Sequence, residues 1–134
     1  MFHREMIPLT MQELIEQALG YPAACAENPF GPESVCIRIG EHGPIFLNLM
    51  PCNRWASFRC EPQMGLIWRS EFPGTVRRGW HCPPAQQPYN NTVTLDGTVP
   101  DDVLLAMLAH SYQRALRSLT KARRAELGLN EKSV

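Results

Sequence analysis

The stretch NTVTLDGTVPDDVLLAMLAHSYQ, residues 91–113, decides the fold that we predict for this chain. Residues 91–95 alternate polar and apolar side chains, as a half-buried strand does, and Asp96-Gly97 then supplies a turn. A long helix is predicted from about Pro100 to a point before Gly128. Its core stripe consists of apolar or small residues at helical spacing, namely Leu104, Met107, Leu108, Ser111, Ala115 and Leu119.

Upstream, the chain opens with a short amphipathic helix. Thr10-Met-Gln-Glu13 has the spacing of a capping box, and apolar residues recur at helical spacing up to Leu19. Gly20 is placed to end this helix. The following residues 21–34 are rich in Pro and Gly, so they are predicted to form an ordered loop.

The middle of the chain is rich in β-forming residues. Residues 35–39 and 45–49 are predicted to pair as a hairpin, because Gly40-Glu-His-Gly43 is a suitable connection. A third strand is predicted over residues 55–60. Pro62 then opens a short helix that ends near Ser70, and residues 75–82 offer a further short strand.

These elements predict an α+β fold in one domain, residues 1–134, with an ordered core of about residues 9–127. The expected architecture is a single antiparallel β-sheet packed with an N-terminal helix, a short middle helix and a long C-terminal helix. No internal repeat and no second apolar core are visible in the sequence. We expect a monomer or a small homo-oligomer.

Composition excludes several classes of protein. Hydrophobic residues make up 44% of the chain and charged residues 19%, which is too apolar for a disordered chain. The 13 basic and 13 acidic residues cancel, so any basic surface must be local. The N-terminus lacks the apolar stretch of a signal peptide, and no segment approaches the roughly 20 apolar residues of a membrane span. We therefore expect a cytoplasmic protein with no membrane partner.

The candidate chemical groups do not form a catalytic or metal site in the sequence. The five cysteines are an odd number without a CxxC pair, and Cys52, Cys60, His81 and Cys82 lack zinc-ligand spacing. There is no phosphate-binding glycine loop, so we expect neither a metal nor a cofactor. His110 and Ser111 are neighbours on a helix and project in different directions, so we expect no catalytic residues and a structural role for Ser111, bonded to a carbonyl of its own helix.

The stretch from Asn91 to Asp102, continued by His110-Ser-Tyr112, resembles the MmcQ/YjbR family. Further matches follow in the order of the family pattern, at Asn28-Pro-Phe-Gly31, Phe46-Leu47, Cys60-Glu-Pro62 and Gly79-Trp-His81. The resemblance covers nearly the whole chain. It implies a bacterial-type family with a compact α+β fold similar to secretion chaperones, and DNA binding through a so-called double wing. It implies no catalytic residues.

One segment departs from the family pattern. The family has a short basic stretch and a Trp directly before the strand at residue 91. Here residues 82–90 are longer and contain no Lys or Arg, and Asn90 stands at the position of the Trp.

Two clusters are candidate nucleic-acid contacts. The first combines charge and rings in Arg77, Arg78, Trp80 and His81, and its structural alternative is a solvated turn anchored by Trp80. The second is a basic helix face whose structural alternative is favourable placement of cations near a helix C-terminus, namely Arg114, Arg117, Lys121 and Arg124.

We therefore expect a non-enzymatic module that binds DNA or another nucleic acid weakly. The alternatives are a protein-binding adaptor or chaperone-like domain with a protein partner, and a small-molecule-binding domain.

Overall fold

A computed structural model describes residues 9–28, 31, 33–79 and 82–129 of the chain. Its four helices are α1 (Met11–Leu19), α2 (Pro62–Glu71), α3 (Asp101–Arg117) and α4 (Lys121–Glu126). Its six strands are β1 (Ala24–Glu27), β2 (Val35–Ile39), β3 (Ile45–Met50), β4 (Trp55–Arg59), β5 (Val76–Arg78) and β6 (Asn90–Thr94). Two short 3₁₀ helices, η2 (Pro51–Asn53) and η3 (Gln87–Tyr89), lie in the connections.

The six strands form one sheet in the order β1-β2-β3-β4-β6-β5, and every ladder between neighbours is antiparallel. Strand β6, which follows β5 in sequence, lies between β4 and β5. The predicted α+β architecture with helices at the N-terminus, the middle and the C-terminal region is confirmed. The hairpin of β2 and β3 and the capping box of Thr10 and Glu13 also form as predicted.

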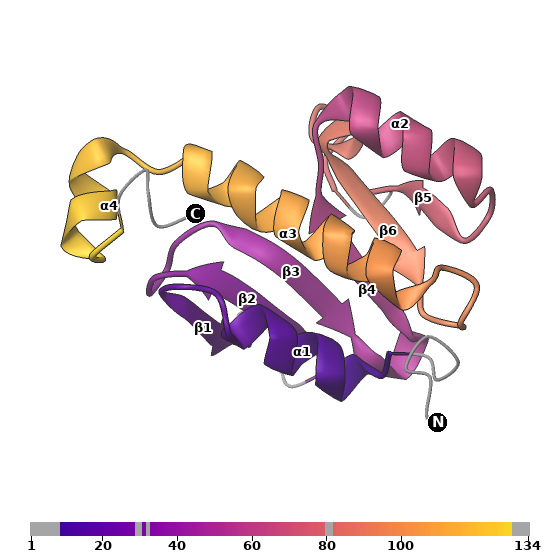
Figure 1. Ribbon diagram of the computed structural model, residues 1–134, viewed down its shortest axis with the longest axis horizontal. Coiled ribbons are helices and arrows are strands. Elements are labelled where there is room, and N and C mark those ends of the chain that lie inside the picture. Colours follow the sequence, from indigo (N-terminus) through magenta and orange to yellow (C-terminus); the bar gives the residue numbers. More distant parts are fainter. Residues whose placement is uncertain (1–8, 29–30, 32, 80–81, 130–134) are drawn as a thin grey trace.

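The register gives the sheet an apolar face and a polar face. Ile37 pairs with Leu47, and Leu47 pairs with Phe58, so these buried side chains share one face. The helices pack on that face: α1 lies against β1 and β2, and α3 lies against β3 and β4 (Figure 1). Helix α2 packs beside β5 and β6. The opposite face carries a row of polar or small side chains that pair across four strands, namely Cys36, Asn48, Ser57 and Thr92.

Helix α3 supplies much of the core. Leu104, Met107, Leu108, Ser111 and Ala115 are buried as predicted for the core stripe, whereas Leu119 is only half-buried. Within the described residues no helix is long and apolar enough to span a membrane.

The loop predicted over residues 21–34 is partly wrong, because residues 24–27 form the edge strand β1. This segment has no strong β-forming pattern of its own. It is held by its ladder to β2 and by an ion pair between Glu27 and Arg38, whose side-chain atoms lie 2.9 Å apart. A tertiary partner therefore creates the strand.

The predicted C-terminal helix is also shorter than expected, because α3 ends at Arg117 and a separate helix follows. Ser118 Oγ donates a hydrogen bond to the carbonyl of Ala115 at 2.6 Å. Thr120 then caps α4, since its hydroxyl accepts the backbone N–H of Arg123 at 3.0 Å. Residues 114–117 and 121–124 consequently belong to two helices and do not form one continuous basic face.

Candidate anion-binding site

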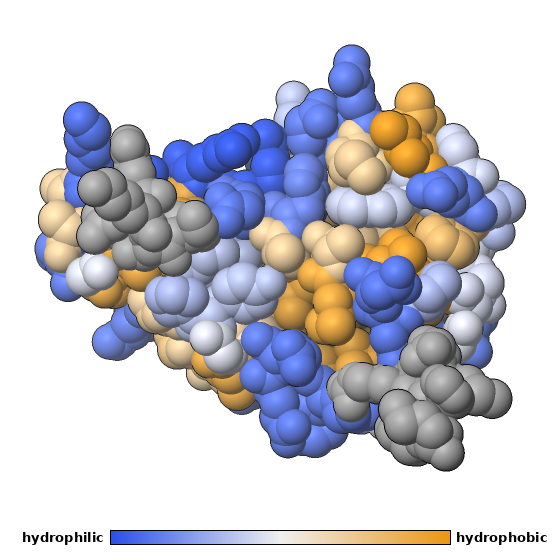
Figure 2. Space-filling view, in the orientation of Figure 1, coloured by the Kyte–Doolittle hydropathy of each residue, from blue (hydrophilic) through white to orange (hydrophobic). Residues whose placement is uncertain are grey.

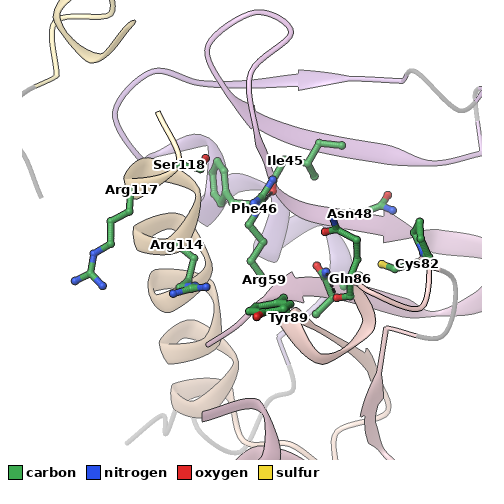
Figure 3. Close-up of a pocket in the computed structure, with 13 residues that line it drawn as sticks. Ile45, Phe46, Asn48, Arg59, Cys82, Gln86, Tyr89, Arg114, Arg117 and Ser118 are labelled. Carbon is green, nitrogen blue, oxygen red and sulfur yellow. Dashed lines mark hydrogen bonds between the residues drawn. The ribbon is translucent and has the colours of Figure 1, made fainter. Parts of the chain in front are cut away.

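A cleft of about 630 Å³ opens at the end of the sheet where β3 and β4 separate (Figure 3). This volume is within the range of small-molecule sites, roughly 300–1,000 Å³. Strands β3 and β4, the segment between β5 and β6, and the C-terminal end of α3 line it. The lining residues are Ile45, Phe46, Asn48, Ser57, Arg59, Cys82, Pro83, Gln86, Tyr89, Asn90, Arg114, Arg117 and Ser118.

Arg59 is the last residue of β4 and its side chain is half-buried in the cleft. Its Nε donates a hydrogen bond to the carbonyl of Ile45, which fixes the direction of the guanidinium. Burial and then the neighbouring charge of Arg114 lower the pKa of Arg59. An arginine nevertheless stays protonated in a protein, so the cleft contains a partly desolvated cation.

Arg114, on α3, is the second cation of the cleft. Its side chain is half-buried, whereas Arg117 is exposed and points away from the other lining residues (Figure 3). Among the described residues none of these three arginines has a carboxylate partner. Two guanidinium groups in a cleft whose lining contains no Asp or Glu favour the binding of an anion, because the anion would relieve their mutual repulsion.

The wall opposite α3 is formed by residues 82–90. Pro83, Pro84 and Pro88 restrict the backbone of this segment, and internal hydrogen bonds hold it. Asn90 Nδ2 donates to the carbonyl of Gln86 at 3.1 Å, and the amide of Gln87 donates to the carbonyl of Cys82 at 3.0 Å. Residues of this segment therefore form one wall of the cleft.

Polar and aromatic groups lie beside the two cations. The ring of Tyr89 is 45% exposed, which leaves a face for stacking. The side chains of Asn48, Gln86 and Asn90 also line the cleft and present amide donors and acceptors. The site can therefore bind an anionic group and contact a ring and a hydrogen-bonding edge next to it.

The sequence His110-Ser111-Tyr112 docks α3 on three other segments. His110 Nε2 accepts the backbone N–H of Glu61 at 3.0 Å, and the Tyr112 hydroxyl donates to the carbonyl of Pro22 at 2.8 Å. Ser111 Oγ accepts the N–H of Arg59 at 2.7 Å and donates to the carbonyl of Phe46 at 2.5 Å.

The expected bond between Ser111 and its own helix is therefore wrong. At this point the sheet offers an N–H and a carbonyl that need a buried partner, and the hydroxyl satisfies both. The hydroxyl and the imidazole are each engaged by backbone groups.

The predicted contact residues are separated in the structure. Arg114 and Arg117 line the cleft, but Lys121 and Arg124 lie on α4 and do not. Arg77 and Arg78 are exposed on the edge strand β5. Trp80 and His81 lie outside the described residues.

Sequence reasoning missed Arg59 and Tyr89. The available signal for Arg59 was the single cation of the strand predicted over residues 55–60, directly before Cys60. Cations at this position are also common on the polar face of a sheet, so the sequence does not identify its role.

The cysteines are all free thiols, and their environments differ. Cys60 is buried beneath α2, and burial raises the pKa of its thiol to about 11, so it is a poor nucleophile at neutral pH. Cys52 is exposed in η2, and Cys82 lines the cleft. Over the described residues, no three His, Cys, Asp or Glu side chains gather as a metal site would require.

Comparison with known proteins gives a family and a fold. A family model described as YjbR matches residues 19–114. A solved structure of the Deinococcus radiodurans protein DR2400, with a DUF419 domain, is 27% identical, covers 92% of this chain and 91% of its own, and has a TM-score of 0.81. A Pseudomonas syringae protein is 15% identical, with 79% and 98% coverage and a TM-score of 0.65, and shows a shared fold. No curated protein matches the chain.

Proposed function

The chain belongs to the YjbR family, and from this premise we propose that it is a non-enzymatic module that binds single-stranded nucleic acid through its arginine cleft. The proposal concerns the cleft formed by β3, β4, residues 82–90 and the end of α3. The ligand is held by its phosphate and contacted at its base.

The observation that carries this proposal is the pair Arg59 and Arg114 in one cleft without an acidic partner among the described residues. Guanidinium groups bind phosphate oxygens through paired hydrogen bonds, and a half-buried site strengthens those bonds. A carboxylate in the cleft would have argued for an internal salt bridge.

Tyr89 and the amides of Gln86 and Asn90 favour a single strand over a duplex. Unpaired bases can stack on an exposed aromatic ring and present their edges to amide groups, whereas a paired base hides its face and its Watson–Crick edge. Zero formal net charge also argues against a broad duplex-binding surface, since such surfaces are strongly basic.

The exposed face of α2 supports a second candidate, the protein-binding adaptor. Leu66 and Ile67 are 57% and 49% exposed there, and Figure 2 shows apolar side chains gathered over this helix. The edge strand β5 lies beside α2. An extended peptide could add to that edge while its apolar side chains contact α2.

Fluorescence anisotropy with a labelled single-stranded oligonucleotide tests the first function. We expect binding at low salt that weakens as salt rises, because phosphate contacts release counterions. The variant Arg59→Gln/Arg114→Gln should weaken binding about a hundredfold or more, since it removes two contacts of charged groups that contribute roughly 1.5–3 kcal/mol each. Arg78→Gln, an exposed arginine outside the cleft, is the matched control and should bind like the wild type.

Two results would contradict the cleft proposal. One is the absence of wild-type binding to any single strand at low salt. The other is equal binding by the double variant with a wild-type melting temperature. Binding that is insensitive to salt and lost in Leu66→Ser/Ile67→Ser would favour the adaptor.

A further inference from the structure

Resting on the proposed function, we infer that the cleft binds the terminal phosphomonoester of a nucleotide, either at the end of a strand or on a free mononucleotide. The placement of charge, the shape of the cleft and the groups beside the cations each support this ligand class.

Charge matching is the first argument. Arg59 and Arg114 place two guanidinium groups in one cleft, and no carboxylate among the described residues pairs with either. A phosphomonoester carries about −1.5 to −2 charges at neutral pH and has three free oxygens. An internal phosphodiester carries one charge and has two free oxygens. The monoester therefore neutralises both cations, whereas the diester would leave one of them uncompensated.

The arrangement of the cations is the second argument. A groove that follows a continuous strand needs positive charges spaced along its path. Here Arg59 and Arg114 line one cleft, and Arg117 points away from the other lining residues (Figure 3). The remaining candidate cations lie outside the lining, on β5 and α4. Within the lining, positive charge thus comes from three arginines in one cleft and not from a row of cations along a groove.

The fixed geometry of the site is the third argument. Arg59 is held at its backbone and at its side chain. Its backbone N–H donates to Ser111 Oγ, and its side-chain Nε donates to the Ile45 carbonyl. The Nη groups of its guanidinium have no acceptor within the described part of the chain and remain available. A cation fixed before the ligand arrives loses little entropy on binding, so it favours one compact group.

The wall of the cleft supplies contacts to the remainder of the nucleotide. Tyr89 belongs to η3 and is half-exposed, and the side chains of Gln86 and Asn90 lie in the same segment. A base stacked on Tyr89 would place its edge near these amides. A cleft of about 630 Å³ has the size of a site for one such unit.

Competition between end groups tests the inference. The probes are one oligonucleotide sequence with a 5′-phosphate, with a 3′-phosphate and with hydroxyls at both ends, together with the 5′- and 3′-phosphate mononucleotides. We expect a phosphorylated end to bind at least about tenfold more tightly than the hydroxyl ends, since one charged hydrogen bond contributes this much. The preference should diminish as pH falls below about 6, where the monoester gains a proton.

Arg114→Gln should remove the preference for a phosphorylated end, while Arg78→Gln should retain it. Calorimetry or anisotropy gives the affinity, and the melting temperature confirms that each variant is folded. Arg117→Gln provides a second cleft variant, expected to change affinity less because that side chain points away.

The outcomes separate this inference from the proposed function. Equal affinity for phosphorylated and hydroxyl ends, reduced by Arg59→Gln/Arg114→Gln, would overturn the inference and leave strand binding intact. Tight binding of a mononucleotide with no binding of any oligonucleotide would support the phosphomonoester site and reject strand binding. Absence of binding by every probe would overturn both.

Discussion

Ser111 Oγ on α3 accepts the backbone N–H of Arg59 on β4 at 2.7 Å, although 51 residues lie between the two positions (111 − 59 − 1). The same hydroxyl donates to the carbonyl of Phe46 on β3. A helix side chain thus replaces a ladder contact where the two strands separate. This relationship fixes Arg59 beside Arg114, which follows Ser111 by one helical turn. The buried hydrogen bonds of Ser111 therefore also determine the position of a cation in the cleft.

Replacing Ser111 by Ala should lower the free energy of unfolding by about 1–3 kcal/mol. The substitution leaves a buried N–H and a buried carbonyl without their partner, and that desolvation is not recovered. Chemical denaturation measures the change. Ser118→Ala is the control, because Ser118 is exposed and bonds only within its own turn, so it should change stability by less than about 0.5 kcal/mol. Equal losses of stability in the two variants would show that the hydrogen bonds of Ser111 to Arg59 and Phe46 do not stabilise the fold.

Replacing Gly65 by Ala should destabilise the fold, although Ala is the better helix former. An added Cβ would lie 2.6 Å from Cys60 Sγ, a buried atom that cannot move freely. Overpacking costs roughly 1–3 kcal/mol, and helix propensity returns at most about 1 kcal/mol. In a double-mutant cycle with Cys60→Ala, the two losses should sum to more than the loss in the double variant. If the two losses instead sum to the loss in the double variant, the strain does not arise from contact between the added Cβ and Cys60 Sγ.

The stability of the protein should fall as pH is lowered through the range in which His110 would gain a proton. Burial and then the charge of Arg114 lower the pKa of His110, and its Nε2 accepts the N–H of Glu61 in the neutral form. As pH falls, His110 therefore gains a proton at a higher pH in the unfolded chain than in the folded protein. The contribution of neutral His110 to the free energy of unfolding is complete above the pKa of the unfolded chain, about 6.5. It is lost as pH falls from there through the lower pKa of the folded protein.

Unfolding free energies between about pH 7.5 and pH 5 measure this effect. The variant His110→Gln should show a shallower decline than the wild type, because the remaining groups titrate in both proteins. Parallel curves for the wild type and His110→Gln would remove His110 as the source.

The split between α3 and α4 gives a prediction for the basic residues. Arg114→Gln should weaken single-strand binding about tenfold or more, whereas Lys121→Gln/Arg124→Gln should change it by less than about twofold at moderate salt. The reason is position, since Arg114 lines the cleft and neither Lys121 nor Arg124 does. Anisotropy titrations compare the variants directly. A larger loss of affinity in Lys121→Gln/Arg124→Gln than in Arg114→Gln would show that the nucleic acid contacts α4 and not the cleft.

Much of the fold could be predicted because its signals are local. The capping box of Thr10 and Glu13, the hairpin turn at residues 40–43 and the turn at Asp96-Gly97 each act within a few residues. Periodicity likewise identified β6 and the start of α3. Family membership also followed from the sequence, through the stretch that contains these last two elements. Two of the cleft cations, Arg114 and Arg117, were candidates for the same reason of helical spacing.

Only the tertiary structure decided which distant segments of the chain lie side by side. Strand β1 exists because β2 offers it a partner, and no periodic pattern in residues 24–27 predicts it. The break after Arg117 depends on side-chain caps that compete with a continuous helix. Arg59 becomes part of a cleft because Ser111 brings α3 to the end of β4. Spacing along a chain cannot specify such a meeting, since the register of the sheet and the position of a docked helix depend on contacts between distant residues.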